Sequence, residues 1–179
     1  MDTPMLQRAI LILILSGASW TVGHGGRLLM RRMKAPAWIA GTLFGFVAFL
    51  VNRVALAGAA WAIYAFLFGN PPDPLILVAL VGLASTPLLL AFVHVTPFFG
   101  PGVLFILYLI TWLRLTSLTS LALGMDWLGC LGWWTAAWLA TSGAGYVLRW
   151  LLRDARWLGW TGIFGPQHVT PQELMARLP

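Results

Sequence analysis

The chain has 179 residues, of which 60% are hydrophobic and 9% are charged, and its mean hydropathy is +0.85. A soluble domain carries roughly 25% charged residues, so the composition excludes an ordinary water-soluble protein and indicates one membrane domain. The net charge is +6 at neutral pH. Because the basic residues stand in short stretches between apolar runs, we expect them to meet anionic lipid headgroups, and we expect no nucleic-acid partner.

The scarce residue types exclude several kinds of site. Cys130 is the only cysteine and lies in an apolar run, so an intrachain disulfide and a CxxC metal site are excluded. The five acidic residues are unpaired and lie outside the apolar runs, and no GxSxG or HExxH motif appears. We therefore expect no catalytic site, no metal site and no dedicated cofactor, although bound lipid is expected.

The first apolar run, residues 6–22, is predicted to cross the membrane, with an interfacial helix as the alternative. A basic stretch follows at 24–35, where apolar residues stand among the charges. This pattern is typical of a short amphipathic helix on the headgroup surface. The cations predicted to contact lipid there are Arg27, Arg31, Arg32 and Lys34.

A second apolar block covers residues 36–69 and is interrupted only by Asn52-Arg53. As one helix it would be about 51 Å long, against a hydrocarbon thickness of roughly 30 Å. Either it is one strongly tilted helix, or it breaks near Asn52-Arg53. A charge at the bilayer midplane is costly, so we expect Arg53 to reach an interface, which favours a break or a large offset.

The central pair of apolar runs, residues 74–95 and 101–121, is predicted to form a helical hairpin around a Pro/Gly turn. Pro87 lies inside the first run, where its ring and its missing N–H predict a bend within one helical turn. Such a proline is tolerated in a bilayer when a nearby hydroxyl satisfies the carbonyl that it frees. Ser85 and Thr86 are placed to do so.

Two polar residues of this hairpin are candidate sites. Arg114 lies inside the run 101–121, but the end of the run is about two turns away, so snorkelling to the interface is the favoured interpretation. Hydroxyl residues follow it and are more typical of interhelical hydrogen bonds than of a conduction path. His94 ends the preceding run and is a candidate haem or chlorophyll ligand, because neutral imidazole binds such metals.

The last predicted span is residues 127–148, and residues 149–179 form a C-terminal tail. The tail begins with arginines beside tryptophans, a pattern typical of an interfacial helix. Its predicted lipid-contacting residues are Arg149, Arg153, Arg156, Trp150 and Trp157. Farther on, Thr170-Pro171-Gln172-Glu173 matches a capping box and predicts a short helix in water.

Small residues recur every four positions in the last span and therefore form one ridge of the helix. The ridge consists of Gly132, Ala136, Ala140 and Ala144. We expect it to pack against a helix of the same chain, with Gly41 and Gly45 as the counterpart. Trp134 and Trp138 occupy another face, which we expect to meet lipid or a partner subunit.

The predicted fold class is thus an all-α polytopic transmembrane bundle of about five spans with basic interfacial helices. With five spans, the stretch 24–35 and the tail from Arg149 fall on the same side. The positive-inside rule places them in the cytoplasm of a cell whose inner (plasma) membrane holds the protein.

The central hairpin resembles the bacterial Yip1-domain family over roughly residues 75–145. The resemblance rests on Ala84-Ser-Thr-Pro87-Leu-Leu and, after Pro97, on Phe99-Gly100-Pro101. The family commonly has an Arg-Glu pair after its fourth span, whereas this chain has Leu118-Thr-Ser-Leu-Ala-Leu-Gly-Met-Asp126. The family's cytoplasmic N-terminus also differs from the orientation that the charges predict here. The resemblance implies a non-enzymatic protein that organises membranes or acts as a scaffold.

Two alternatives remain open at this point. In the first alternative, the chain is an accessory subunit of a large respiratory or photosynthetic complex. Its tryptophan-rich faces would then contact lipid, quinone, carotenoid or chlorophyll, and other membrane subunits. The second alternative, a transporter component around Arg53 and Arg114, has no inverted repeat or carboxylate relay to support it.

Overall fold

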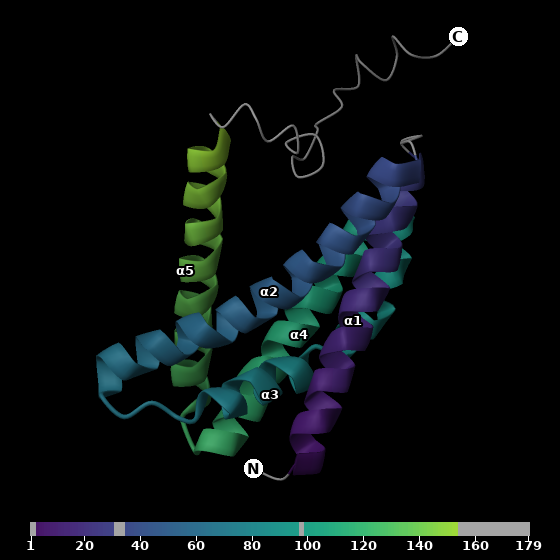
Figure 1. The fold of residues 1–179 in the computed structure, drawn as a ribbon. Coiled ribbons are helices and arrows are strands. Elements are labelled where there is room, and N and C mark those ends of the chain that lie inside the picture. The colour runs from purple at the N-terminus through teal and green to yellow at the C-terminus, as the bar shows by residue number, and fades with distance from the viewer. Residues whose placement is uncertain (1–2, 31–34, 97–98, 154–179) are drawn as a thin grey trace. The chain divides into compact units, whose positions relative to one another are not determined.

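The computed structural model describes residues 3–30, 35–96 and 99–153, and these residues form helices and short connections without any strand. The predicted all-helical class is confirmed over these ranges (Figure 1). The elements are α1 (Thr3–Met30), α2 (Ala35–Phe68), α3 (Pro74–Ala84), the 3₁₀ helix η1 (Thr86–Val95), α4 (Gly100–Leu123) and α5 (Trp127–Arg153). Contacts divide the chain into residues 1–143 and 144–179, and the packing below is that of the first unit.

Three of the described helices are long and apolar enough to cross a membrane: Thr3–Leu29, Trp38–Phe68 and Gly100–Leu123. The bent pair of α3 and η1 is a fourth candidate if it counts as one span. Over its described residues α5 is not among them, because tryptophan, glycine and threonine lower its mean hydropathy. The structure therefore supports a polytopic membrane protein.

Helix α1 continues without a break to Met30, so the prediction that a separate basic segment begins at residue 24 is wrong. The reason is packing against η1. A Cβ at Gly23 would collide with the His94 ring, and one at Gly26 would collide with Val95. Two glycines thus let η1 approach the last turns of α1, which then stay helical. Arg27 is half-buried there.

Several predicted lipid-contacting residues cannot be placed. Arg31, Arg32, Lys34, Arg156 and Trp157, together with the capping box at Thr170, lie outside the described residues, and for Arg149, Trp150 and Arg153 only the helical backbone of α5 is described.

Helix α2 is a single helix of 34 residues, so the predicted break near Asn52-Arg53 does not occur. Figure 1 shows α2 beside α1 near Ala35 and diverging from it toward Phe68. At 1.5 Å per residue α2 is about 51 Å long. Of the two arrangements that fit the sequence, the structure adopts the long continuous helix.

The bend at Pro87 is confirmed, since α3 and η1 meet at 49°. Thr86 Oγ1 donates to the carbonyl of Leu83 at 2.7 Å, the group that a residue other than proline at position 87 would bond in an α-helix. Ser85 Oγ likewise donates to Val81 O at 2.8 Å. The two hydroxyls act as the sequence predicts, and the chain leaves the bend as a 3₁₀ helix of ten residues.

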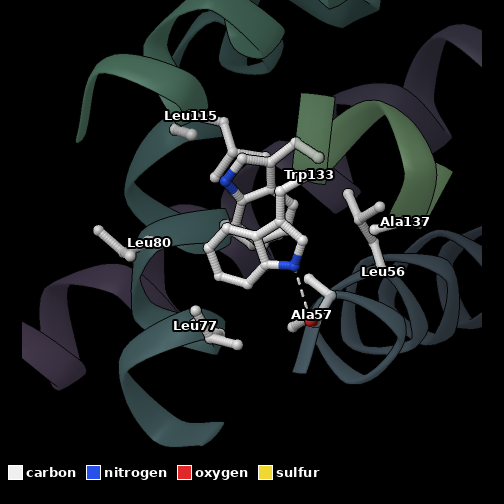
Figure 2. Packing of buried hydrophobic residues seen from close by; sticks show 11 residues of the cluster. Leu56, Ala57, Leu77, Leu80, Leu115, Trp133 and Ala137 are labelled. Atoms are coloured by element: carbon white, nitrogen blue, oxygen red, sulfur yellow. Dashed lines mark hydrogen bonds between the residues drawn. The ribbon is translucent and has the colours of Figure 1, made fainter. Parts of the chain in front are cut away.

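The larger core cluster joins α2, α3, α4 and α5 around two tryptophans. Figure 2 shows Trp133 among leucine and alanine side chains, with its indole N–H directed at α2. That N–H donates to the carbonyl of Ala60 at 2.8 Å. Trp134 stacks beside it, with ring centroids 5.2 Å apart. The buried members are Leu56, Ala57, Ala60, Leu77, Leu80, Val81, Ala84, Leu115, Trp133, Trp134 and Ala137.

Candidate functional site

A buried arginine is the most unusual feature of the membrane-spanning part. Arg53 is the middle residue of Trp38–Phe68, and only 7% of its surface is exposed. Its guanidinium carbon lies 5.1 Å from the centre of the Phe49 ring and 5.3 Å from that of Tyr108. Phe49 is one turn earlier on α2, whereas Tyr108 belongs to α4. The prediction that Arg53 snorkels to an interface is therefore wrong, because two aromatic rings hold it inside.

The energy of this arrangement is partly balanced. An arginine at the centre of a membrane helix costs about 2.5–3.5 kcal/mol on insertion scales. A desolvated cation–π contact contributes about 2 kcal/mol or more, so Phe49 and Tyr108 offset most of that cost. They do not satisfy every hydrogen-bond donor of the guanidinium, because the Arg53 Nε–H has no acceptor in the described structure. An unsatisfied buried donor costs about 1–3 kcal/mol.

No acidic side chain neutralises Arg53 within the described ranges. The acidic residues described are Asp73 and Asp126, and both cap helices. Asp73 Oδ1 accepts from Leu75 N at 2.8 Å, and Asp126 Oδ2 accepts from Gly129 N at 3.1 Å. In the part of the chain that the structure describes, Arg53 therefore has no carboxylate partner.

Arg53 lines a cavity of about 610 Å³ between α2, α4 and α5. Ligand pockets in proteins measure about 300–1,000 Å³, so the cavity has the size of a binding site. The walls are mainly apolar and aromatic, with an amide, three threonine hydroxyls and the arginine among them. The lining residues are Asn52, Arg53, Leu56, Phe105, Tyr108, Leu109, Thr111, Trp112, Leu115, Thr135, Trp138 and Thr141.

The threonine hydroxyls of the cavity donate their protons to their own helices. Thr111 Oγ1 donates to Leu107 O at 2.8 Å, and Thr135 Oγ1 donates to Leu131 O at 2.6 Å. Thr141 Oγ1 is shared between the carbonyls of Ala137 and Trp138, at 3.1 and 3.0 Å. The other donors among the lining residues are the guanidinium of Arg53, the amide of Asn52, the hydroxyl of Tyr108 and the indole N–H groups of Trp112 and Trp138.

The second predicted intramembrane cation behaves differently. Arg114 on α4 is exposed and does not line the cavity. The hydroxyls that follow it mostly bond within α4, as Thr116 does to Trp112 O at 3.1 Å and Ser117 to Leu113 O at 3.0 Å. Two of these described hydroxyls also join α4 to α5: Thr119 accepts from Trp134 Nε1 at 2.9 Å, and Ser117 accepts from Trp127 Nε1 at 3.4 Å. The prediction of interhelical hydrogen bonds therefore holds for two residues of this group.

His94 is buried on η1 beside α1, with 1% of its surface exposed. Its ring stacks on Trp20 with centroids 5.9 Å apart, and Trp20 stacks on His24 at 5.1 Å. Nδ1 contacts the carbonyl of Ala91, and the neutral tautomer that donates to this carbonyl has its lone pair on Nε2. Nε2 has no hydrogen bond, and in that tautomer it offers the lone pair that a metal would need. His94 does not line the cavity described above, and its assignment as a haem or chlorophyll ligand remains a prediction.

The described residues contain no group of three or more histidine, cysteine or carboxylate side chains that could hold a metal ion. Cys130 is buried and free. These observations add no site to those already described.

Contrary to prediction, the small-residue ridge of α5 does not pack against another helix in the described part of the chain. Gly132, Ala136 and Ala140 are exposed, and a Cβ added at Gly132 would meet no atom within 4 Å. The buried residues of α5 lie on a neighbouring face of the helix, roughly 100° around its axis from the ridge. The predicted counterpart is also wrong for Gly45, which packs against Trp20 and His24 of α1.

The other two small residues of this prediction, Gly41 and Ala144, differ in their burial. Gly41 is buried on the α2 helix, whereas Ala144 lies in the second unit and is exposed. Of the tryptophan face, Trp138 is 52% exposed as expected, but Trp134 is fully buried. The indole N–H explains the difference, because Trp134 reaches a hydrogen-bond acceptor on α4.

Sequence reasoning missed the cavity because its walls come from three helices. Tyr108, Trp112 and Trp138 carry no motif, and only the fold brings them near Arg53. The single signal available in the sequence was a cation in the middle of an apolar block. Comparison of the chain with family models, with curated proteins and with solved structures finds no match.

Proposed function

We propose that the chain is a non-catalytic, multi-pass protein of the inner (plasma) membrane that acts as a scaffold and docks another membrane protein through α5. The supporting observation is that α5 divides its faces. Trp133 and Trp134 anchor one face to α2 and α4 through hydrogen bonds, while the ridge of Gly132, Ala136 and Ala140 stays exposed.

In a membrane, a ridge of small residues is suited to contact with another helix. Lipid tails are as apolar as leucine, so helices associate through close van der Waals contact, and small residues allow backbones to approach. A ridge of small side chains that no helix of the first unit covers is suited to a helix from outside it. A scaffold role is also what the resemblance to the Yip1-domain family implies.

The same ridge would serve an accessory subunit of a larger complex, and the identity of the partner separates the two roles. A scaffold binds its partner but does not purify in fixed stoichiometry with a pigmented complex. An accessory subunit purifies in fixed stoichiometry with a respiratory or photosynthetic complex, whose absorption spectrum accompanies the chain.

The test compares two adjacent residues of α5 at the same depth. Ala140→Phe places a large ring on the ridge, whereas Leu139→Phe enlarges a residue on another exposed face. We expect the wild-type chain and Leu139→Phe to migrate in mild-detergent extracts as an assembly larger than the 19.6 kDa chain. Ala140→Phe should release the single chain. A wild-type chain that migrates alone, or equal release by both variants, would contradict the proposal.

A further inference from the structure

We propose that the cavity between α2, α4 and α5 binds the acidic group of an amphipathic membrane molecule, a carboxylate or phosphate on an apolar tail, with Arg53 as its cationic partner. This inference concerns a ligand site and goes beyond the scaffold role. It does not depend on the α5 ridge, because the ridge residues do not line the cavity.

The first argument is charge. Arg53 is 7% exposed, and the Asp73 and Asp126 carboxylates of the described ranges are engaged at helix N-termini. The Phe49 and Tyr108 rings against the guanidinium stabilise the cation, and the Tyr108 side chain is also its hydrogen-bond partner. The buried Nε–H of Arg53 has no acceptor in the described structure. An acid group in the cavity supplies both the opposite charge and an oxygen acceptor.

The second argument is the chemistry of the walls. The hydroxyl protons of Thr111, Thr135 and Thr141 are already donated to helix carbonyls. Of the donors that remain, the only charged one among the lining residues is Arg53, and the Asn52 amide is its neighbour on α2. The end of the cavity at Arg53 therefore favours an anion, whereas mainly leucine and aromatic side chains form the rest of its wall.

The third argument is access. Phe105, Leu109 and Trp138 line the cavity, yet 70%, 48% and 52% of their surfaces are exposed. The cavity thus opens on the apolar outer surface of α4 and α5. A molecule with an apolar tail can enter from the hydrocarbon region with its tail in the opening and its acid group at Arg53. A free inorganic anion has no such route through lipid.

The experiment is a native mass-spectrometry titration of the purified full chain in an uncharged detergent. The probes are oleate, which carries a carboxylate, phosphatidylglycerol, which carries a phosphodiester, and inorganic phosphate, which has no tail. Phosphatidylcholine is the zwitterionic control lipid. We expect one oleate or one phosphatidylglycerol to bind per chain, and whichever binds more tightly identifies the source of the acid group.

Three variants test the site. Arg53→Gln should weaken binding at least tenfold, while Arg114→Gln, which alters an exposed arginine of α4 outside the cavity, should leave it unchanged. Leu109→Trp fills the opening without touching the charge and should also weaken binding. It decides the question if Arg53→Gln does not fold.

The proposal is overturned by unchanged binding in a folded Arg53→Gln or, if that variant does not fold, by unchanged binding in Leu109→Trp. Equal occupancy by phosphatidylcholine, equal affinity for inorganic phosphate, or no binding of either oleate or phosphatidylglycerol would overturn it as well.

Discussion

Trp134 of α5 donates its indole N–H to the hydroxyl of Thr119 on α4 at 2.9 Å, and both side chains are fully buried. The Thr119 hydroxyl in turn donates to Leu115 O at 2.7 Å, so one oxygen both accepts and donates. In a low-dielectric interior such a chain of hydrogen bonds is costly to interrupt. This bond and the one from Trp133 to Ala60 O hold α5 to the other helices.

The first prediction concerns this bond. Thr119→Val should destabilise the chain by about 1–3 kcal/mol, because it leaves a buried indole N–H without an acceptor. The same substitution should cost less in a Trp134→Phe background, where that donor is gone. Reversible unfolding in mixed SDS micelles measures both values and their coupling. Thr21→Val is the control, since its hydroxyl donates only to Gly17 O in its own helix; equal losses at positions 21 and 119 would refute the interpretation.

The second prediction concerns the contact of α1 with α3. A Cβ at Gly82 would collide with the backbone of Ala9, which a rotamer change cannot relieve. Gly82→Ala should therefore destabilise the chain by about 1–3 kcal/mol through overpacking. Gly58→Ala in α2 is the matched control, because nothing lies within 4 Å of the added atom there. The control should stabilise the helix by about 0.5–1 kcal/mol. Thermal unfolding in detergent compares the two, and a stabilised Gly82→Ala would show that α1 and α3 do not meet closely.

The third prediction concerns the 3₁₀ helix. Ser19 Oγ donates to Leu89 O at 2.7 Å and accepts from Phe92 N at 3.0 Å, so one hydroxyl of α1 satisfies two backbone groups of η1. Long 3₁₀ segments have poor internal hydrogen bonds and depend on such support. Ser19→Ala should cost about 1–3 kcal/mol and speed amide hydrogen exchange at Phe92. Ser117→Ala is the control, since Ser117 is exposed and its hydrogen bonds, to Leu113 O and from Trp127 Nε1, do not involve η1. Unchanged exchange at Phe92 would rule out this role for Ser19.

The fourth prediction concerns topology. If α2, the bent pair of α3 and η1, α4 and α5 all cross the membrane, four crossings separate position 34 from the tail. Both ends then lie on the same side, the cytoplasm according to the basic residues. Labelling of Lys34→Cys and Gln172→Cys in a Cys130→Ser background by an impermeant maleimide checks this. Labelling from opposite sides would mean an odd number of crossings, as expected if the bent pair re-enters from the side it started on.

The local features of the chain were predictable because they depend on neighbouring residues. The bend at Pro87 follows from a ring and a missing N–H, and the hydroxyls that compensate stand one and two residues earlier. By contrast, the first span was expected to end near residue 22, because a basic stretch follows at 24–35. Only the approach of η1 at Gly23 and Gly26 explains why the helix continues.

Of the candidate site, only the unusual position of one charged residue was visible in the sequence. Arg53 in an apolar block is visible in the sequence, but the expected outcome was exposure at an interface. The structure holds the charge inside, between Phe49 and Tyr108. Which aromatic side chains of α4 and α5 face α2 depends on how the helices rotate and cross. No spacing within one helix carries that information.

The sequence by itself indicated a membrane environment, the helical class and the position of the bend. Composition and the length of the apolar runs carry the first two, and the geometry of proline, which acts over one or two turns, carries the third. Only the tertiary structure decided that α2 is unbroken, that Trp134 is buried while the ridge at Ala136 is exposed, and that Arg53 lines a cavity. In a helix that is apolar on every side, hydrophobicity does not distinguish the face that meets another helix from the face that meets lipid. That choice rests on close packing and on a few hydrogen bonds between residues far apart in the chain.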